Sequence, residues 1–149
     1  MHTALSKSSA SFGKQQEFSA IAKLVSEDFD VYVTLIDNKQ IDCILRLPNR
    51  KYLDIQIKAR SKDAKQSHTF APLSFKARKN FYFVFYTEKS GDYWIMPSRS
   101  VRVFGKINKG GKNVDKVTLR IPPSTRSIKW NIFQRYRNEK GFSLLRAYR

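Results

Sequence analysis

Three polar residues, Asp42, Gln56 and Lys58, are spaced so that a β-hairpin would bring their side chains together. Two predicted strands, 41–47 and 52–59, place Asp42 and Gln56 equidistant from the middle of the turn, so antiparallel pairing sets them opposite each other. Lys58 lies two residues further along, on the same face and within diagonal reach of Asp42. A carboxylate, a carboxamide and an ammonium in one small volume are the groups needed to hold a divalent cation and a phosphate.

The elements that must position these residues are a helix and a set of strands. Apolar residues recur at helical spacing from Lys14 to Ser26, which predicts an amphipathic helix with Glu17 at the edge of its core-facing stripe. Residues 31–36 precede the hairpin and complete an antiparallel meander. The almost continuous apolar run at 80–86 predicts a central strand that is covered on both faces.

The rest of the chain gives weaker signals. Residues 93–97 and 117–121 are predicted strands, and 98–104 form either a short helix or an extension of the strand before them. Polar residues 60–72 and the glycine-rich segment 105–112 are predicted loops, whereas the helical content of 126–149 is not fixed by its pattern.

Length and composition favour one folded domain of 149 residues, in which a flexible Ser-rich segment, 1–12, precedes a domain at 13–149. The single cysteine, Cys43, excludes an internal disulfide, and no Cys/His spacing suggests zinc. No apolar segment has the length of a signal peptide core or a membrane span. We expect a cytoplasmic protein without a membrane partner.

The charge of the chain points to a polyanionic partner. There are 29 Lys and Arg against 12 Asp and Glu, and the segment 99–149 alone holds 14 basic and 2 acidic residues. We expect this third to contact double-stranded DNA through Arg99, Arg102, Lys106, Lys109, Lys112, Lys116, Arg120, Arg126, Lys129, Arg135 and Arg137. The aromatic residues between these cations either stack on unpaired bases or, more commonly, pack in a core or a subunit interface.

At these residues the chain resembles the PD-(D/E)XK nuclease superfamily. The resemblance rests on a helix bearing Glu17, on Asp42 at the start of a hairpin strand and on Gln56-Ile57-Lys58 in the next strand. The small size, the basic charge and the Gln-x-Lys variant look most like the homing endonucleases associated with group I introns. The resemblance implies an α/β (α+β) fold with a restriction-endonuclease-like core, in which helices flank a mixed β-sheet.

The same resemblance implies a sequence-specific endonuclease that hydrolyses phosphodiester bonds of double-stranded DNA with Mg²⁺. Asp42, Gln56 and Glu17 would be the metal ligands, and Lys58 would steer or help to deprotonate the attacking water. The family usually has Asp or Glu where this chain has Gln56, so a weaker metal site is expected. Cleavage of both strands demands two active sites, which implies a homodimer or homotetramer.

Other interpretations remain open from the sequence. The alternation of polar and apolar residues at 52–58 is also what any half-exposed strand shows. The activity could be that of a restriction, junction or repair nuclease, and a catalytically inactive nucleic-acid-binding module of the same fold would keep the charge without the chemistry. An RNA-binding or ribosome-associated protein would also carry this charge.

Overall fold

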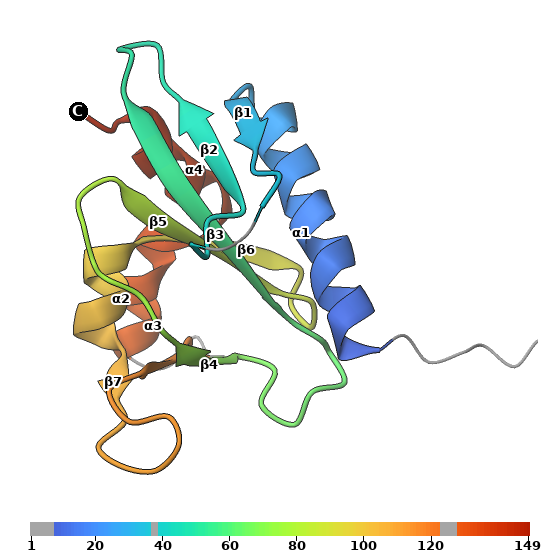
Figure 1. Cartoon of the computed structure of the whole chain (residues 1–149), viewed down its shortest axis with the longest axis vertical. Helices are drawn as coiled ribbons and strands as arrows, with labels where there is room; N and C mark the ends of the chain where they lie inside the picture. Colours follow the sequence, from blue (N-terminus) through green and yellow to red (C-terminus); the bar gives the residue numbers. More distant parts are fainter. Residues whose placement is uncertain (1–7, 37–38, 123–127) are drawn as a thin grey trace, which may run out of the picture.

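A five-stranded mixed sheet in the order β1-β2-β3-β5-β6 forms the centre of the computed structural model, which describes residues 8–36, 39–122 and 128–149 (Figure 1). Its strands are β1 (Asp30–Val33), β2 (Cys43–Arg46), β3 (Tyr52–Arg60), β5 (Phe81–Thr87) and β6 (Asp92–Pro97). β3 and β5 are parallel and the other neighbours are antiparallel. The central position of β5 explains its composition, because both of its faces are covered.

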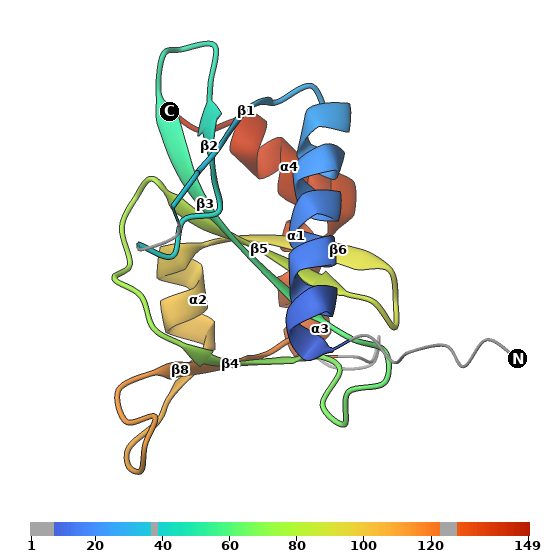
Figure 2. The ribbon, with the colours of Figure 1, turned by 45° about the vertical axis from the view of Figure 1, so that its right-hand side comes forward.

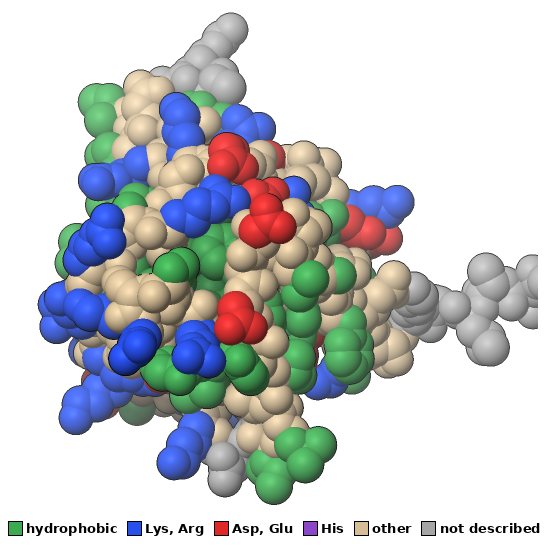
Figure 3. All heavy atoms as spheres, turned by 90° about the horizontal axis from the view of Figure 1, so that it is seen from above, with side chains coloured by type: hydrophobic (Ala, Val, Ile, Leu, Met, Phe, Trp, Pro, Cys, Tyr) green, Lys and Arg blue, Asp and Glu red, His purple; other side chains and the backbone are tan. Residues whose placement is uncertain are grey.

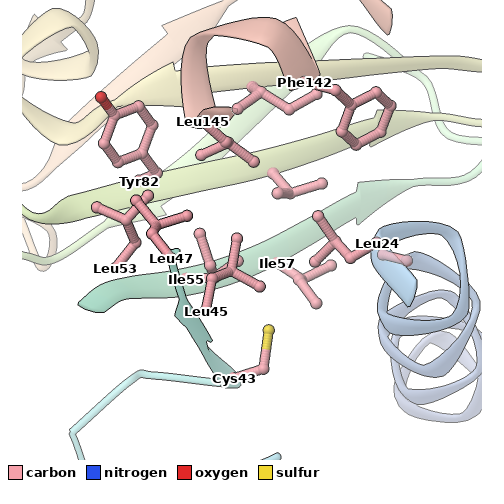
Figure 4. Close-up of a cluster of buried hydrophobic side chains, with 13 residues drawn as sticks. Leu24, Cys43, Leu45, Leu47, Leu53, Ile55, Ile57, Tyr82, Phe142 and Leu145 are labelled. Atoms are coloured by element: carbon pink, nitrogen blue, oxygen red, sulfur yellow. The ribbon is translucent and has the colours of Figure 1, made fainter. Parts of the chain in front are cut away.

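One face of this sheet is covered by α1 (Ser9–Ser26) and α4 (Asn138–Arg146). The side chain of Ser8 caps α1 by accepting a hydrogen bond from the Ser11 amide at 3.2 Å. Leu24 of α1 and Leu145 of α4 meet the apolar side chains of β2, β3 and β5 in one buried cluster (Figure 4).

The opposite face carries a second, three-stranded sheet in the order β4-β8-β7 and three short helical segments (Figure 2). The elements of this layer are β4 (Thr69–Leu73), α2 (Ser98–Phe104), β7 (Lys106–Ile107), β8 (Val117–Arg120), α3 (Ile128–Phe133) and the 3-10 turn η1 (Gln134–Tyr136). A cluster of buried aromatic and aliphatic side chains joins this layer to β5 and β6.

The sequence predictions are confirmed for most of the central sheet. The register within the hairpin is the one predicted, since Cys43 pairs with Ile55 and Leu45 with Leu53. The paired strands end there, before Asp42, whose N–H donates to the carbonyl of Ile55 at 2.9 Å. The mixed sheet with helices on both faces is the predicted fold class. None of the helices in the described part of the chain is long and apolar enough to cross a membrane.

Several boundaries differ from the predictions. Residues 60–72 are not entirely a loop, because Phe70 and Leu73 of β4 are buried against the aromatic cluster and β4 pairs with β8. β1 ends at Val33, and Leu35 is 99% exposed. The first helix starts at Ser9 rather than Lys14, so it takes in 9–12 of the segment predicted to be flexible, while 1–7 lie outside the described residues.

The C-terminal third also differs in detail. The predicted loop at 105–112 contains two paired residues, Lys106 and Ile107, which form β7. Phe133, Tyr136 and Phe142 are buried, so the interpretation of these aromatic side chains as core residues is confirmed for them. They are not available to stack on bases.

Candidate functional site

The pairing between β2 and β3 ends beside Asp42. β2 pairs with residues 52–55 of β3, whereas the remaining part of β3 pairs only with β5 among the described strands. Where the ladder stops, Asp42 Oδ2 accepts a hydrogen bond of 2.6 Å from the backbone N–H of Ile57. The carboxylate thus takes the place of the next backbone acceptor, and this fixes it at the point where β2 and β3 separate.

Gln56 and Lys58 lie on the face of β3 that carries the aromatic cluster. Their partners in the parallel pairing with β5 are Phe83 and Phe85, respectively. Asp42 is 7% exposed and Gln56 is 4% exposed, whereas Lys58 is half-buried. Lys58 forms no ion pair with a carboxylate of the described residues. The structure therefore brings these three predicted residues to one end of the hairpin.

Glu17 approaches from the other face of the sheet. α1 packs its buried residues, Ala20 and Leu24, against the opposite cluster, and Glu17 forms an ion pair of 3.0 Å with Lys14. Burial, together with the nearby carboxylates of Asp42 and Glu17, raises the pKa of the Cys43 thiol to about 12. α1 therefore carries Glu17 on the face of the sheet opposite to that of Gln56 and Lys58.

Asp54 precedes Gln56 by two residues in β3 and has a different partner. Its carboxylate forms an ion pair with the guanidinium of Arg78. The backbone of Arg78 is fixed by the hydroxyl of Ser98, which accepts from its N–H at 3.0 Å and donates to its carbonyl at 2.9 Å. Arg78 thus connects Asp54 of β3 to Ser98 at the start of α2. The sequence did not reveal this contact.

The donor set can be compared with what a metal ion requires. Within residues 8–36, 39–122 and 128–149, no three His, Cys, Asp or Glu side chains gather closely enough to hold a metal. A site at Asp42 must therefore use the amide oxygen of Gln56, backbone carbonyls or water. These are hard oxygen donors, and Mg²⁺ characteristically combines one or two carboxylates with several waters. The residues present fit Mg²⁺ with a small number of protein ligands.

Most of the predicted DNA-contacting residues are on the surface. Arg99, Arg102, Lys106, Lys109, Lys112, Arg120, Lys129 and Arg135 are exposed, and Lys116 is half-buried. Arg137 is held within the fold, because its Nε lies 3.0 Å from Asp92 and its guanidinium lies over Trp130. Arg126 lies outside the described residues.

The sequence interpretation missed several cations. The sequence interpretation assigned no role to Lys65, His68 or Lys89. The structure places all three around a hollow of about 970 Å³ beside three of the predicted DNA-contacting residues, Lys106, Arg120 and Lys129. No local signal could have grouped these six residues, because they come from five separate segments.

A second hollow, of about 660 Å³, lies between the C-terminal end of α1 and the β2–β3 turn. It is lined by both signs of charge, and Arg146 there forms ion pairs with Glu27 and Glu139 at 2.7 and 2.8 Å. Viewed from this end, the surface shows acidic side chains among the Lys and Arg side chains (Figure 3). The charge at this end is therefore partly compensated.

Comparison with known proteins identifies a fold relative. No family model matches the sequence, and no curated protein matches it. Seven chains of solved structures match. One is a bacterial homing endonuclease, I-Ssp6803I, with a TM-score of 0.65 and 14% sequence identity over 93% of this chain and 91% of that chain. At this identity the likeness is one of fold.

Proposed function

We propose that the protein is a Mg²⁺-dependent, sequence-specific endonuclease of double-stranded DNA, of the homing type, with a PD-(D/E)XK-like site at Asp42, Gln56 and Lys58. One observation supports this most strongly: where β2 and β3 separate, the carboxylate of Asp42 is fixed by the backbone N–H of Ile57, the residue between Gln56 and Lys58. The fold that carries this arrangement is similar to that of a bacterial homing endonuclease.

In this proposal Asp42 and the amide oxygen of Gln56 hold the metal. A bound Mg²⁺ supplies polarisation of the phosphate and a bound water of lowered pKa. The hydrogen bond from Ile57 N–H fixes the orientation of the Asp42 carboxylate. Because Gln56 brings no negative charge, we expect weaker metal binding than at a site with two carboxylates.

Lys58 acts on the phosphate and on the attacking water. Its ammonium attracts the scissile phosphate, offsets negative charge in the transition state and positions the water for deprotonation. Partial burial strengthens each of these electrostatic effects, since the local dielectric constant is lower than that of water. Glu17 completes the site through water, because it approaches from the opposite face of the sheet.

The assembly follows from the proposed reaction. Cleavage of both strands of a duplex needs two sites, so the active form in this proposal is a homodimer or homotetramer. The net charge of +17 opposes self-association, and we expect bound DNA to promote assembly by neutralising that charge.

The test compares the wild type with Asp42→Asn and Lys58→Ala. Genomic DNA is incubated with each pure protein and Mg²⁺ or EDTA, and newly formed ends are counted by sequencing, so that no target site need be known beforehand. We expect discrete Mg²⁺-dependent ends from the wild type and at least a 100-fold reduction from each variant. Duplex binding, measured by fluorescence anisotropy, should change by less than about 5-fold for Lys58→Ala, which removes one phosphate contact.

Asp63→Ala provides the matched control, because Asp63 is an exposed carboxylate in the loop after β3. It should cut like the wild type. Equal cutting by the wild type and the Asp42→Asn and Lys58→Ala variants would falsify the assignment of the site.

A second candidate function is a DNA-binding module without catalysis. The observation in its favour is the neutral Gln56 at a position where a carboxylate would strengthen a metal site. This function predicts that the wild type binds duplex DNA but yields no new ends with Mg²⁺. Gln56→Glu would then be the informative variant, since Mg²⁺-dependent cutting restored by one added carboxylate would mark Gln56 as the cause of the loss.

A further inference from the structure

The hollow of about 970 Å³ is built on the outer face of the small sheet. Residues on this sheet alternate, so that Val117 and Leu119 of β8 enter the core while Thr118 and Arg120 face outward. Lys106 pairs with Thr118 in the β7–β8 ladder, which places its side chain on the same outer face. The floor of the hollow thus presents hydroxyls and cations.

The walls add further positive charge. They come from the loop before β4, with Lys65, from the β5–β6 turn, with Lys89, and from α3, with Lys129. No Asp or Glu lines this hollow, and none of its five Lys and Arg side chains is ion-paired with a carboxylate in the part of the chain that the structure describes. This uncompensated charge contrasts with the mixed charges of the smaller hollow.

The pKa of His68 depends on the charges around this hollow. Its Nδ1 lies 3.1 Å from the hydroxyl oxygen of Ser67. Burial lowers the pKa of His68, and the charges of Lys89 and Arg120 lower it further, while Asp92 of β6 acts in the opposite sense. The imidazolium is therefore disfavoured as long as nothing offsets the surrounding cations.

We propose that this basic cleft, lined by Lys65, Lys89, Lys106, Arg120, Lys129 and His68, binds consecutive phosphates of a DNA backbone segment. The hydroxyls of Thr118 and Ser90 and the five cations are the groups that proteins use to contact phosphate. The volume is at the upper end of the range for ligand pockets, about 300 to 1,000 Å³, and leaves room for more than a single ion. The choice of DNA as the source of phosphate rests on the proposed function.

The first experiment removes two cations from the cleft and compares this with an equal loss elsewhere. Lys89→Ala/Lys106→Ala removes two exposed lysines of the cleft. The control, Lys51→Ala/Lys79→Ala, removes two exposed lysines whose ammonium groups each lie 5.8 Å from the ring of Tyr148, outside the cleft.

Duplex affinity is then measured without Mg²⁺, from 50 to 200 mM salt. Each phosphate contact contributes about −0.9 to the slope of log K against log salt, so the cleft variant should lose about 1.8 from that slope. The loss of duplex affinity of the cleft variant, relative to the wild type, should consequently be about 12-fold larger at 50 mM than at 200 mM salt. Parallel slopes for the cleft variant and the control would overturn the proposal.

The second experiment follows His68 by NMR in a His2→Ala protein, in which it is the only histidine. A bound phosphate offsets Lys89 and Arg120, so a duplex should raise the pKa of His68, and binding should tighten as the pH falls through that range. If inorganic phosphate raises the pKa of His68 but the duplex does not, the cleft binds a free anion rather than DNA. If neither raises this pKa, the proposal is refuted. Neither experiment needs cleavage, so a failure of the endonuclease activity remains a separate result.

Discussion

Replacement of Asp42 by Ala and by Asn should separate the structural contribution of this carboxylate from its chemistry. In the wild type its Oδ2 accepts the Ile57 N–H at 2.6 Å, and both residues are almost fully buried. Asp42→Ala leaves that N–H without its acceptor, and an unsatisfied buried donor costs about 1–3 kcal/mol. Asp42→Asn keeps an oxygen acceptor but loses the charge, which about halves the strength of the bond.

We therefore expect the free energy of unfolding to fall by about 2 kcal/mol for Asp42→Ala and by about half as much for Asp42→Asn. Urea denaturation followed by the fluorescence of the buried Trp94 measures both values, and amide hydrogen exchange measures the protection of Ile57 directly. The exposed control Asp63→Ala should stay within about 0.5 kcal/mol of the wild type. An Asp42→Ala protein as stable as this control, in which the Ile57 amide exchanges no faster than in the wild type, would show that the hydrogen bond contributes nothing to stability.

Further predictions concern three other parts of the fold. Asp92→Ala should lower the free energy of unfolding by about 2 kcal/mol in urea denaturation, because it removes the acceptor of Arg137 at 3.0 Å; the partial exposure of Arg137 limits the loss. Gly141→Ala should destabilise by about 1–3 kcal/mol, measured in the same way, because its new methyl group would meet the carbonyl of Tyr136. Burial and the nearby carboxylates raise the pKa of Cys43 from 9.0 to about 12, so the thiol ionises first in the unfolded chain and stability is lost as the pH rises through that window. Between these two pKa values, Cys43 should lower the free energy of unfolding by about 1.4 kcal/mol per pH unit. Urea denaturation at several pH values measures this contribution, which should be absent in Cys43→Ala.

The parts of the fold that were predicted correctly are those specified by local pattern. The register of β2 with β3 depends on the symmetry of one short turn and on the alternation of two strands, all within 18 residues of sequence. The helix that carries Glu17 follows from the spacing of its own apolar residues.

The parts that were missed depend on contacts between distant segments. β4 is short and contains Pro72, and it becomes a strand by pairing with β8, nearly 50 residues later. The face of the sheet from which Glu17 approaches is set by the packing of α1 rather than by its sequence position. Lys65 and Lys89 join the basic cleft only because the small sheet and the β5–β6 turn meet, which no local pattern encodes.

The most direct test of the central claim is a titration of the uniformly ¹⁵N-labelled protein with Mn²⁺, which replaces Mg²⁺ and broadens the NMR signals of nearby nuclei. We expect early and selective loss of the signals of the Gln56 side-chain amide and the backbone amides of Ile57 and Lys58, and no such loss in Asp42→Asn. Broadening that instead centres on Glu27 and Asp30, or that is unchanged in Asp42→Asn, would contradict it.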